Sequence, residues 1–285
     1  MARTNPRPVG YARSYPLLRR TTTLYARADL ALARMLKALR LGAEGVLTSA
    51  LTTAEKSDLT VALFDAQSTG FANELSAWEQ RWYEQELPPA PCRLLLAAAG
   101  FGRELLPLCA AGYTVDAFEP AESHLAILRA RAGDAVETMC GSFADFIAAV
   151  SHGELNALSP LSHRAYDAVI LGWGSLTHVL EDAERRALLR ACDQLVGNGP
   201  ILASFWLGRQ AAIRSRALTL GAAMGRRLAA LRGISASVPP GQVFRTHAGF
   251  AHEFTPEEIE ALAADCGRRV RWGRDGYPHI TLLKA

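Results

Sequence analysis

The sequence lacks several features that would define a protein class at once. No stretch of its 285 residues approaches the roughly 18 apolar residues that a transmembrane helix needs, so we do not expect an integral membrane protein. Its five cysteines are odd in number and include no C-x-x-C pair, so neither a disulfide framework nor a metal site is expected. The N-terminus has no apolar segment ahead of a small-residue cleavage site, which favours a cytoplasmic protein.

Lysine is also scarce, since only Lys37, Lys56 and Lys284 are lysines among the 31 basic residues. We attribute the arginine excess to genomic base composition rather than to function. The formal net charge of +3 is too small to indicate a nucleic-acid-binding protein by itself. Hydrophobic residues make up 49% and charged residues 21%, which is ordinary for a globular protein and excludes a disordered or collagen-like chain.

The N-terminal third of the chain has a pattern of its own. Residues 1–20 carry five arginines, three prolines and no acid, which predicts a basic, mobile arm. Residues 21–91 show apolar side chains at helical spacing and a capping-box pair, Thr52 and Glu55, before a cluster of prolines that no helix continues through. We therefore predict a helical N-terminal cap or lid over 21–91 and a main domain over 92–285.

After the prolines, short apolar runs alternate with helical segments. This alternation predicts an α/β fold, with a doubly wound and mostly parallel sheet of seven strands between two layers of helices. A strong helix start at Thr255-Pro256-Glu257-Glu258 precedes the last two strands, which are able to pair antiparallel. The expected strands span residues 93–97, 113–119, 137–140, 166–171, 201–206, 270–272 and 279–283.

The sharpest local feature is the turn Ala98-Ala99-Gly100-Phe101-Gly102 between the first strand and its helix. Glycines there let a ligand approach the backbone and expose the N–H groups of the helix start. The second strand ends at Glu119, where a carboxylate is able to accept both ribose hydroxyls of an adenosine-containing ligand. Because ligands of open α/β sheets bind at the carboxyl ends of the strands, these residues predict a nucleotide site.

Two common nucleotide fingerprints do not fit this turn. The nicotinamide-dinucleotide pattern needs a small third residue, and Leu105 stands at that position. A Walker A loop needs a Gly-Lys-Ser/Thr triplet, which the sequence does not contain.

From Arg93 to about Lys284 the chain resembles the class I S-adenosylmethionine-dependent methyltransferases, with their Rossmann-like fold, and among them the small-molecule type. The resemblance rests on the order and spacing of five segments: Ala98-x-Gly100-x-Gly102, Val115–Pro120, Gly141–Phe146, Tyr166–Leu171 with the following Gly-Trp-Gly-Ser, and Phe254–Glu258. It implies S-adenosylmethionine as the cofactor. By this resemblance Ala98, Gly100 and Gly102 border its methionine part, Glu119 binds the ribose, Ser142 and Phe143 lie beside adenine, and Gly172 and Trp173 flank the sulfonium.

The sequence departs from that family at two positions. The family usually has an acid where Leu96 stands and a glycine where Ala98 stands. The missing acid normally organises the amino-acid end of the cofactor, and two interpretations of Arg103 follow: it meets the cofactor carboxylate in compensation, or it is a solvated residue at a helix start. A non-catalytic S-adenosylmethionine-binding module is therefore an alternative to an enzyme.

The acceptor side offers His178 as a catalytic general base, since an imidazole titrates near neutral pH and this residue follows the fourth strand. The alternative is that His178 caps or packs at the next helix. His247 and His252 lie in a region that could also face the site, whereas Asp145 is expected to cap a helix.

Two further segments have two interpretations each. The aromatic helix around Trp78, Trp82 and Tyr83 either docks on the sheet domain or closes over the cofactor as a lid. The segment Arg209–Arg232 (with the insertion at about 208–232) carries six arginines and no acid, so it is either a solvated face over a buried stripe or a surface for a membrane, an acidic peptide or a nucleic acid.

We expect a small-molecule or peptide acceptor, methylated on oxygen or nitrogen. Methyltransferases that act on exocyclic base nitrogens resemble one another in an Asn/Asp-Pro-Pro-aromatic motif after strand four. Here that place holds Gly172-Trp173-Gly174-Ser175. An RNA methyltransferase remains the alternative because of the basic segments.

Overall fold

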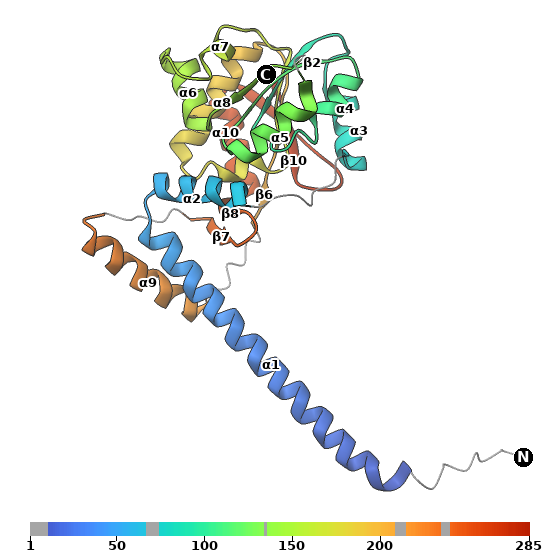
Figure 1. The fold of residues 1–285 in the computed structure, drawn as a ribbon, viewed down its shortest axis with the longest axis vertical. Helices are drawn as coiled ribbons and strands as arrows, with labels where there is room; N and C mark the ends of the chain where they lie inside the picture. The colour runs from blue at the N-terminus through green and yellow to red at the C-terminus, as the bar shows by residue number, and fades with distance from the viewer. Residues whose placement is uncertain (1–10, 67–73, 134–135, 209–214, 235–239) are drawn as a thin grey trace, which may run out of the picture. The chain divides into compact units, whose positions relative to one another are not determined.

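Strands and helices alternate from Arg93 onward, as the sequence pattern predicts, and the strands form one sheet. The computed structural model describes residues 11–66, 74–133, 136–208, 215–234 and 240–285. The seven strands lie in the order β3-β2-β1-β4-β5-β10-β9, with β10 antiparallel to both of its neighbours. They are β1 (Arg93–Ala97), β2 (Thr114–Glu119), β3 (Thr138–Cys140), β4 (Ala168–Leu171), β5 (Ile201–Ser204), β9 (Arg268–Trp272) and β10 (His279–Lys284). The predicted doubly wound fold is confirmed (Figure 1).

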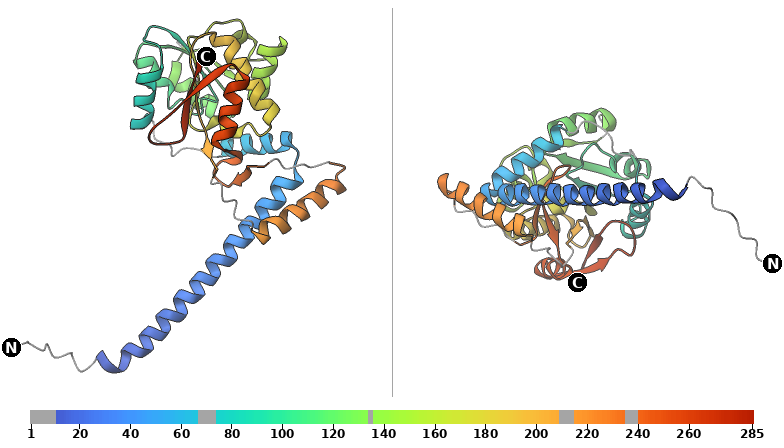
Figure 2. Two further views of the ribbon diagram at one scale, coloured as in Figure 1. Left: turned by 180° about the vertical axis from the view of Figure 1, so that it is seen from behind. Right: turned by 90° about the horizontal axis from the view of Figure 1, so that it is seen from below.

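Helices cover both faces of this sheet, because its central strands are apolar on both sides. In β1, Leu95 and Ala97 face one apolar cluster while Leu94 and Leu96 face the other, and all four are fully buried. Burial of each leucine contributes about 1.5–3 kcal/mol. One cluster is covered by α6 (Phe143–His152), α8 (Asp182–Val196) and α10 (Pro256–Asp265), and the other by α3 (Ala77–Glu86), α4 (Leu105–Ala110) and α5 (Glu122–Ala132) (Figure 2).

A second, smaller sheet was not predicted. Its three strands lie in the order β6-β8-β7, with β6 at Trp206–Leu207, β7 at Gln242–Arg245 and β8 at Gly249–Phe254. The strands β7 and β8 are joined by a tight turn, and β6 directly follows β5. The predicted fifth strand, 201–206, is thus divided between the two sheets. Short segments α7 (Ser159–Ser162) and the 3-10 turn η2 (Ser175–His178) complete this part of the chain.

The N-terminal helices belong to two different units. The described residues form two compact units, a helical unit within Met1–Ala50 and Ile213–Gly233 and a sheet unit within Leu51–Ala212 and Ile234–Ala285. The helical unit consists of α1 (Tyr11–Ala50) and α9 (Arg216–Leu231), which pack side by side. The predicted boundary at residue 91 falls inside the sheet unit, because α2 (Thr53–Ala66) and α3 belong to it.

The predicted mobile arm also differs from the structure where the two overlap. Residues 1–10 lie outside the described residues, but α1 begins at Tyr11 and so includes residues 11–20 of that arm. The chain from Leu17 to Leu41 contains neither glycine nor proline, so this stretch has no residue that breaks a helix. Among the described helices, none is both long and apolar enough to cross a bilayer.

Candidate functional site: a cavity at the carboxyl edge of the sheet

A cavity of about 250 Å³ lies where the strand order reverses between β1 and β4. This is the point at which open α/β sheets bind ligands, because the loops from the two neighbouring strands diverge there. Eight of the nine site residues predicted from the sequence line it: Ala98, Gly100, Glu119, Ser142, Phe143, Gly172, Trp173 and His178. One wall comes from α2, through Ser57, Thr60, Val61 and Phe64.

The turn after β1 has a backbone that favours glycine. Ala98, Gly100 and Gly102 have φ angles of 52°, 55° and 79°, in the left-handed region that L side chains rarely adopt. At Gly100 a Cβ would meet nothing within 4 Å, so the backbone borders open space. At Gly102 it would lie 2.5 Å from Leu128 Cδ1 of α5. Gly102 does not line the cavity, and its glycine is explained by close packing of the turn against α5.

Glu119 is fixed by the backbone at the end of β2. Its Oε2 accepts a hydrogen bond from the N–H of Gly100 at 2.8 Å, and its Oε1 accepts one from the N–H of Ala121 at 3.0 Å. Burial raises the pKa of this carboxyl to about 7, although the two N–H groups act in the opposite direction. Each oxygen keeps a further lone pair, so the carboxylate is able to accept two more hydrogen bonds from a ligand.

The start of α6 forms the side of the cavity next to Glu119. Ser142 is the N-cap residue: its N–H donates to Asp145 Oδ2 at 2.8 Å, and Asp145 N–H donates back to Ser142 Oγ at 3.2 Å. This capping box confirms the predicted role of Asp145. The ring of Phe143 stands edge-on to Phe118, with 5.9 Å between centroids. The capping box therefore fixes the backbone of the two lining residues, Ser142 and Phe143.

A buried carboxylate that sequence reasoning missed is Glu104. Its side chain lines the cavity, is almost fully buried, and accepts a hydrogen bond from the Tyr83 hydroxyl at 2.8 Å. It lies against the backbone of Gly172, because a Cβ built there would be 2.2 Å from Glu104 Oε1. Burial raises the pKa of Glu104, while the Arg103 guanidinium, 3.5 Å away, opposes that shift. The signal in the sequence was an acid beside the glycine turn, two residues after Gly102.

Arg103 lines the cavity, and its side chain is largely buried, so it is not a solvated residue at a helix start. Its guanidinium forms an ion pair with Glu79 of α3, including a hydrogen bond of 2.7 Å from Nη1 to Oε2. It also lies over the ring of Trp173, with 4.3 Å from Cζ to the ring centroid. Trp173 has a φ of 46° and stacks on Tyr277. Arg103 therefore links α3 to the loop after β4 and holds that loop beside the cavity.

His178, on η2, also lines the cavity. Its Nδ1 is 3.1 Å from the carbonyl oxygen of Phe250, and since a carbonyl only accepts, Nδ1 carries the proton. Nε2 is then the basic nitrogen of the neutral ring. Burial lowers the pKa of His178, and Phe64 stands edge-on to the ring at 5.4 Å. At neutral pH the imidazole is therefore uncharged and able to accept a proton.

Two more polar groups line the cavity beside His178. Ser175 Oγ is buried, and the described residues offer it no hydrogen-bond partner. Glu184, on the first turn of α8, has a pKa raised by burial and by Glu181. Neither was a predicted catalytic residue. With Glu104 and Glu119, Glu184 makes three carboxyl groups on the cavity wall, beside the guanidinium of Arg103.

Structural comparison identifies the fold, although no protein-family model and no curated protein matches the sequence. The CcbJ methyltransferase of Streptomyces caelestis is similar with a TM-score of 0.52 and 16% identity, over 82% of this chain and 100% of that chain. A SAM-dependent methyltransferase of Leishmania major is similar with a TM-score of 0.51 and 14% identity, over 80% and 82%. The protein has the class I methyltransferase fold. The family resemblance of the sequence is therefore confirmed at the level of the fold.

In this methyltransferase fold the other candidate histidines lie away from the cavity. His247 is exposed, and His252, on β8, is buried with its Nε2 3.3 Å from Glu258 Oε2 of α10. The aromatic helix α3 docks on the sheet: Trp82 is buried and its Nε1 donates to Thr281 Oγ1 at 3.0 Å. The lining residues include four from α2 and none from α3.

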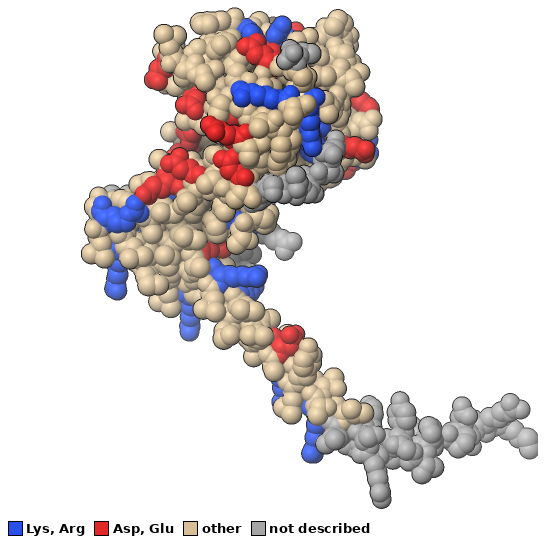
Figure 3. All heavy atoms as spheres, viewed as in Figure 1, with Lys and Arg blue, Asp and Glu red and all other residues tan. Residues whose placement is uncertain are grey.

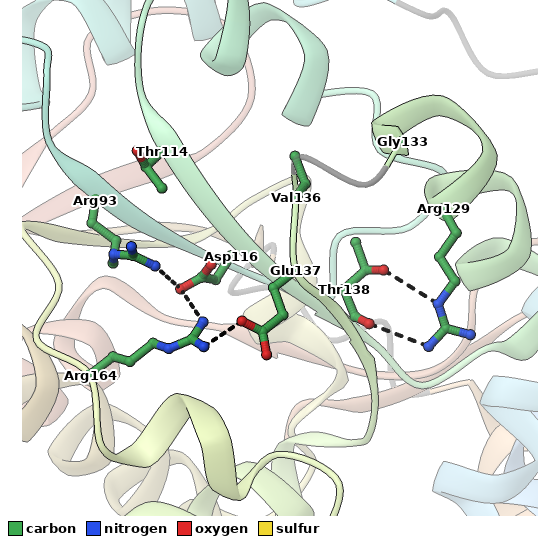
Figure 4. Close-up of a pocket in the computed structure, with 9 residues that line it drawn as sticks. All are labelled: Arg93, Thr114, Asp116, Arg129, Gly133, Val136, Glu137, Thr138 and Arg164. Carbon is green, nitrogen blue, oxygen red and sulfur yellow. Dashed lines mark hydrogen bonds and ion pairs between the residues drawn. The ribbon is translucent and has the colours of Figure 1, made fainter.

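A larger hollow of about 740 Å³ lies at the amino ends of β1, β2 and β3. Arg93, Asp116, Glu137 and Arg164 are directed at one another, and Arg129 is directed at Thr138 (Figure 4). Buried Asp116 accepts hydrogen bonds from Arg93 at 2.9 Å, Arg164 at 3.0 Å and the Tyr166 hydroxyl at 2.9 Å, and Arg164 also pairs with Glu137. These ion pairs and hydrogen bonds connect neighbouring segments of the sheet, so a structural role explains the cluster.

Proposed function

We propose that the protein is an S-adenosylmethionine-dependent methyltransferase that acts on a small-molecule or peptide acceptor. The observation that carries this proposal is the pair of buried carboxylates, Glu119 and Glu104, on one cavity at the switch point of a methyltransferase fold. The pair matches the two polar ends of the cofactor, a ribose diol and an ammonium group. Similarity to structures described as methyltransferases supports the same function.

The residues present fit this cofactor. Glu119 has free acceptor capacity for ribose hydroxyls, and Gly100 leaves open space where a side chain would obstruct the methionine part. Glu104, beside Gly172, would accept from the ammonium group and thereby replace the acid that the family has at Leu96. Ser142 and Phe143 would border adenine, and Ala98, Gly172 and Trp173 the methionine and sulfonium.

Methyl transfer is an in-line displacement, in which the bound cofactor supplies an electrophilic methyl group on its sulfonium. The residues of this chain would orient the acceptor and exclude water, with Val61 and Phe64 of α2 as the apolar wall. His178 Nε2 would take the proton of an acceptor hydroxyl or amine, because the hydrogen bond to Phe250 leaves that nitrogen basic. Glu184 would bind an acceptor of positive charge or share the proton.

Calorimetry tests the cofactor. We expect S-adenosylmethionine and S-adenosylhomocysteine to bind, and NADH not to bind under the same conditions. Binding of NADH alone would overturn the proposal.

Transfer of a labelled methyl group tests the enzyme and its acceptor class. Fractions of a cell extract are incubated with the protein and labelled cofactor, with and without prior nuclease treatment. We expect label in small molecules or peptides. Label in RNA would replace the proposed acceptor, and cofactor binding without any transfer would favour a non-catalytic module.

A further inference from the structure

The helical unit formed by α1 and α9 has no part in the cavity, and its charge differs sharply from that of the sheet unit. Residues 1–50 and 213–233 contain 14 basic and 2 acidic residues, whereas the remaining chain contains 17 basic and 26 acidic residues. The small net charge of the protein therefore conceals a strongly cationic unit. Figure 3 shows Lys and Arg side chains spaced along the two helices, with few acidic ones among them.

Helix α1 carries most of its exposed apolar side chains on one face and a row of arginines on the other, although Leu30 lies on the arginine side and Asp29 on the apolar side. Every residue from Leu18 to Arg40 is exposed. Leu18, Tyr25, Leu32 and Leu39 recur every seven residues, close to two helical turns, and so lie along one face with Leu24, Met35 and Leu36 beside them. Arg20, Arg27 and Arg34 recur at the same interval, two residues later, which places them about 200° around the helix.

Helix α9 repeats this chemistry independently. Its small residues Gly221 and Gly225 lie against α1, where a Cβ would be 2.0 Å from Gly42 O and 2.5 Å from Val46 O respectively. Away from that contact α9 exposes large apolar side chains, each between 43% and 85% exposed, and basic ones. The apolar set is Leu220, Met224, Leu228 and Leu231, and the basic set is Arg216, Arg226 and Arg227.

We propose that α1 and α9 bind the surface of an anionic phospholipid membrane, with the apolar side chains in the headgroup boundary and the arginines near the lipid phosphates. Such a surface uses both features of each helix, the apolar face and the excess of positive charge. The sheet unit, whose charge is negative, remains in water. This inference does not depend on the proposed methyltransferase activity.

Two alternative binding partners, a second copy of α1 and a nucleic acid, would account for only part of the apolar and basic surface. A second copy of α1 would cover the apolar face, but the positions that flank it (Thr22, Asp29 and Leu36 on one side, Leu24, Ala31 and Ala38 on the other) hold no opposite charges to specify a coiled coil. It would also leave the exposed leucines of α9 unexplained. A nucleic acid would pair with the arginines but would leave the apolar faces of both helices in water.

Flotation of the full chain with vesicles tests the proposal. The vesicles contain phosphatidylcholine with an equal amount of phosphatidylglycerol, or phosphatidylcholine alone. We expect binding to the anionic vesicles only, and weaker binding when salt is raised from about 0.1 M to about 1 M, where the Debye length falls from about 10 Å to about 3 Å. Arg27→Gln with Arg34→Gln and, separately, Leu32→Gln with Leu36→Gln should each lower the partition coefficient by about tenfold or more.

Matched controls lie in the sheet unit. Arg269→Gln with Arg274→Gln removes the same charge, and Leu155→Gln removes one leucine that is more exposed than Leu32 or Leu36; both variants should bind like the unaltered protein. Circular dichroism should show the same helix content in the glutamine variants as in the unaltered protein. Absence of binding to anionic vesicles overturns the proposal, as does binding that the α1 variants leave unchanged. A dimer that Leu32→Gln with Leu36→Gln dissociates, or binding to RNA without binding to vesicles, would assign the surface to those occupants instead.

Discussion

Glu104 shows how a side chain's neighbours decide its role. The sequence resemblance predicts an acid at the position of Leu96, but this leucine is fully buried on the face of β1 that α3, α4 and α5 cover. The carboxylate reaches the same edge of the sheet from the start of α4 instead, held by Tyr83. Because Glu104 lies against Gly172, it borders the cavity at the end proposed for the ammonium group of the cofactor.

Glu104→Gln should weaken S-adenosylmethionine binding by about 10- to 100-fold, since a hydrogen bond to a charged group is worth about 1.5–3 kcal/mol. The amide keeps the shape and removes only the charge. Isothermal titration calorimetry measures the change. Tyr83→Phe is the matched control: it removes the hydroxyl that binds Glu104 but leaves the carboxylate, so affinity should change by less than about threefold while unfolding becomes easier by about 1 kcal/mol. Unchanged affinity in Glu104→Gln would remove the residue from the proposed site.

Glu119 should make cofactor affinity depend on pH near neutrality. Its pKa is raised to about 7, mainly by burial, so the proton is bound below that pH and lost above it. Ribose hydroxyls donate to the carboxylate form, and affinity should therefore rise by about tenfold between about pH 6 and about pH 8.

Titration of the cofactor itself affects the affinity of every variant in the same way. The difference in pH dependence between the unaltered protein and Glu119→Gln therefore reports the titration of Glu119 alone. That variant should bind more weakly at about pH 8 and lose the difference between the two pH values. Calorimetry at both pH values measures this. A pH dependence that is the same in both proteins would contradict the assignment.

His178 should affect turnover rather than cofactor binding. His178→Asn removes the basic Nε2, and kcat should fall by about 10²–10⁴-fold while the Kd for S-adenosylmethionine changes little. Steady-state kinetics on the acceptor found by methyl labelling measures the first value, and calorimetry the second. His252→Asn is a control, because His252 lies outside the cavity and should leave kcat unchanged. An unaltered kcat in His178→Asn would leave positioning alone as the mechanism.

At the scale of elements, capping residues determine where helices begin, whereas tertiary packing determines where each helix docks. Capping pairs were visible in the sequence and form as expected: Thr52 with Glu55, and Thr255 with Glu258. The aromatic residues of α3 suggested a lid over the cofactor as one interpretation, but their rings pack on the sheet. Four lining residues of the cavity come instead from α2, a helix whose sequence has no comparable aromatic cluster.

The α1–α9 pair depends on glycines that allow close backbone approach. Gly221→Val would place side-chain atoms against the carbonyl of Gly42, which belongs to backbone and has no room to move aside. Overpacking of this kind costs about 1–3 kcal/mol. Limited proteolysis of α1 should become about tenfold faster or more, whereas cofactor affinity should be unchanged because the cavity lies wholly in the sheet unit.

Ala230→Val is the control on the same helix, since Ala230 is exposed and should tolerate the change. Equal proteolysis of the two variants would indicate that the helices do not depend on this contact.

At the scale of the whole molecule, the two structural units carry net charges of opposite sign. A protein of net charge +3 consists of a cationic helical unit and an anionic sheet unit whose cavity is itself lined by three carboxyl groups. The cationic unit interrupts the methyltransferase fold as an insertion after β6, paired with the N-terminal helix. The two proposals therefore concern separate parts of one chain, a cofactor site and a membrane-binding surface.

The sequence by itself determined the features that depend on neighbours along the chain. Alternating apolar runs specified the strands, the glycine turn and Glu119 specified the carboxyl edge of β1 and β2, and capping residues specified helix starts. Only the tertiary structure decided the partners of Arg103, the place of Glu104, the wall formed by α2 and the pairing of α1 with α9. These features depend on contacts between residues far apart in the chain, and local periodicity carries no information about which distant side chains will meet.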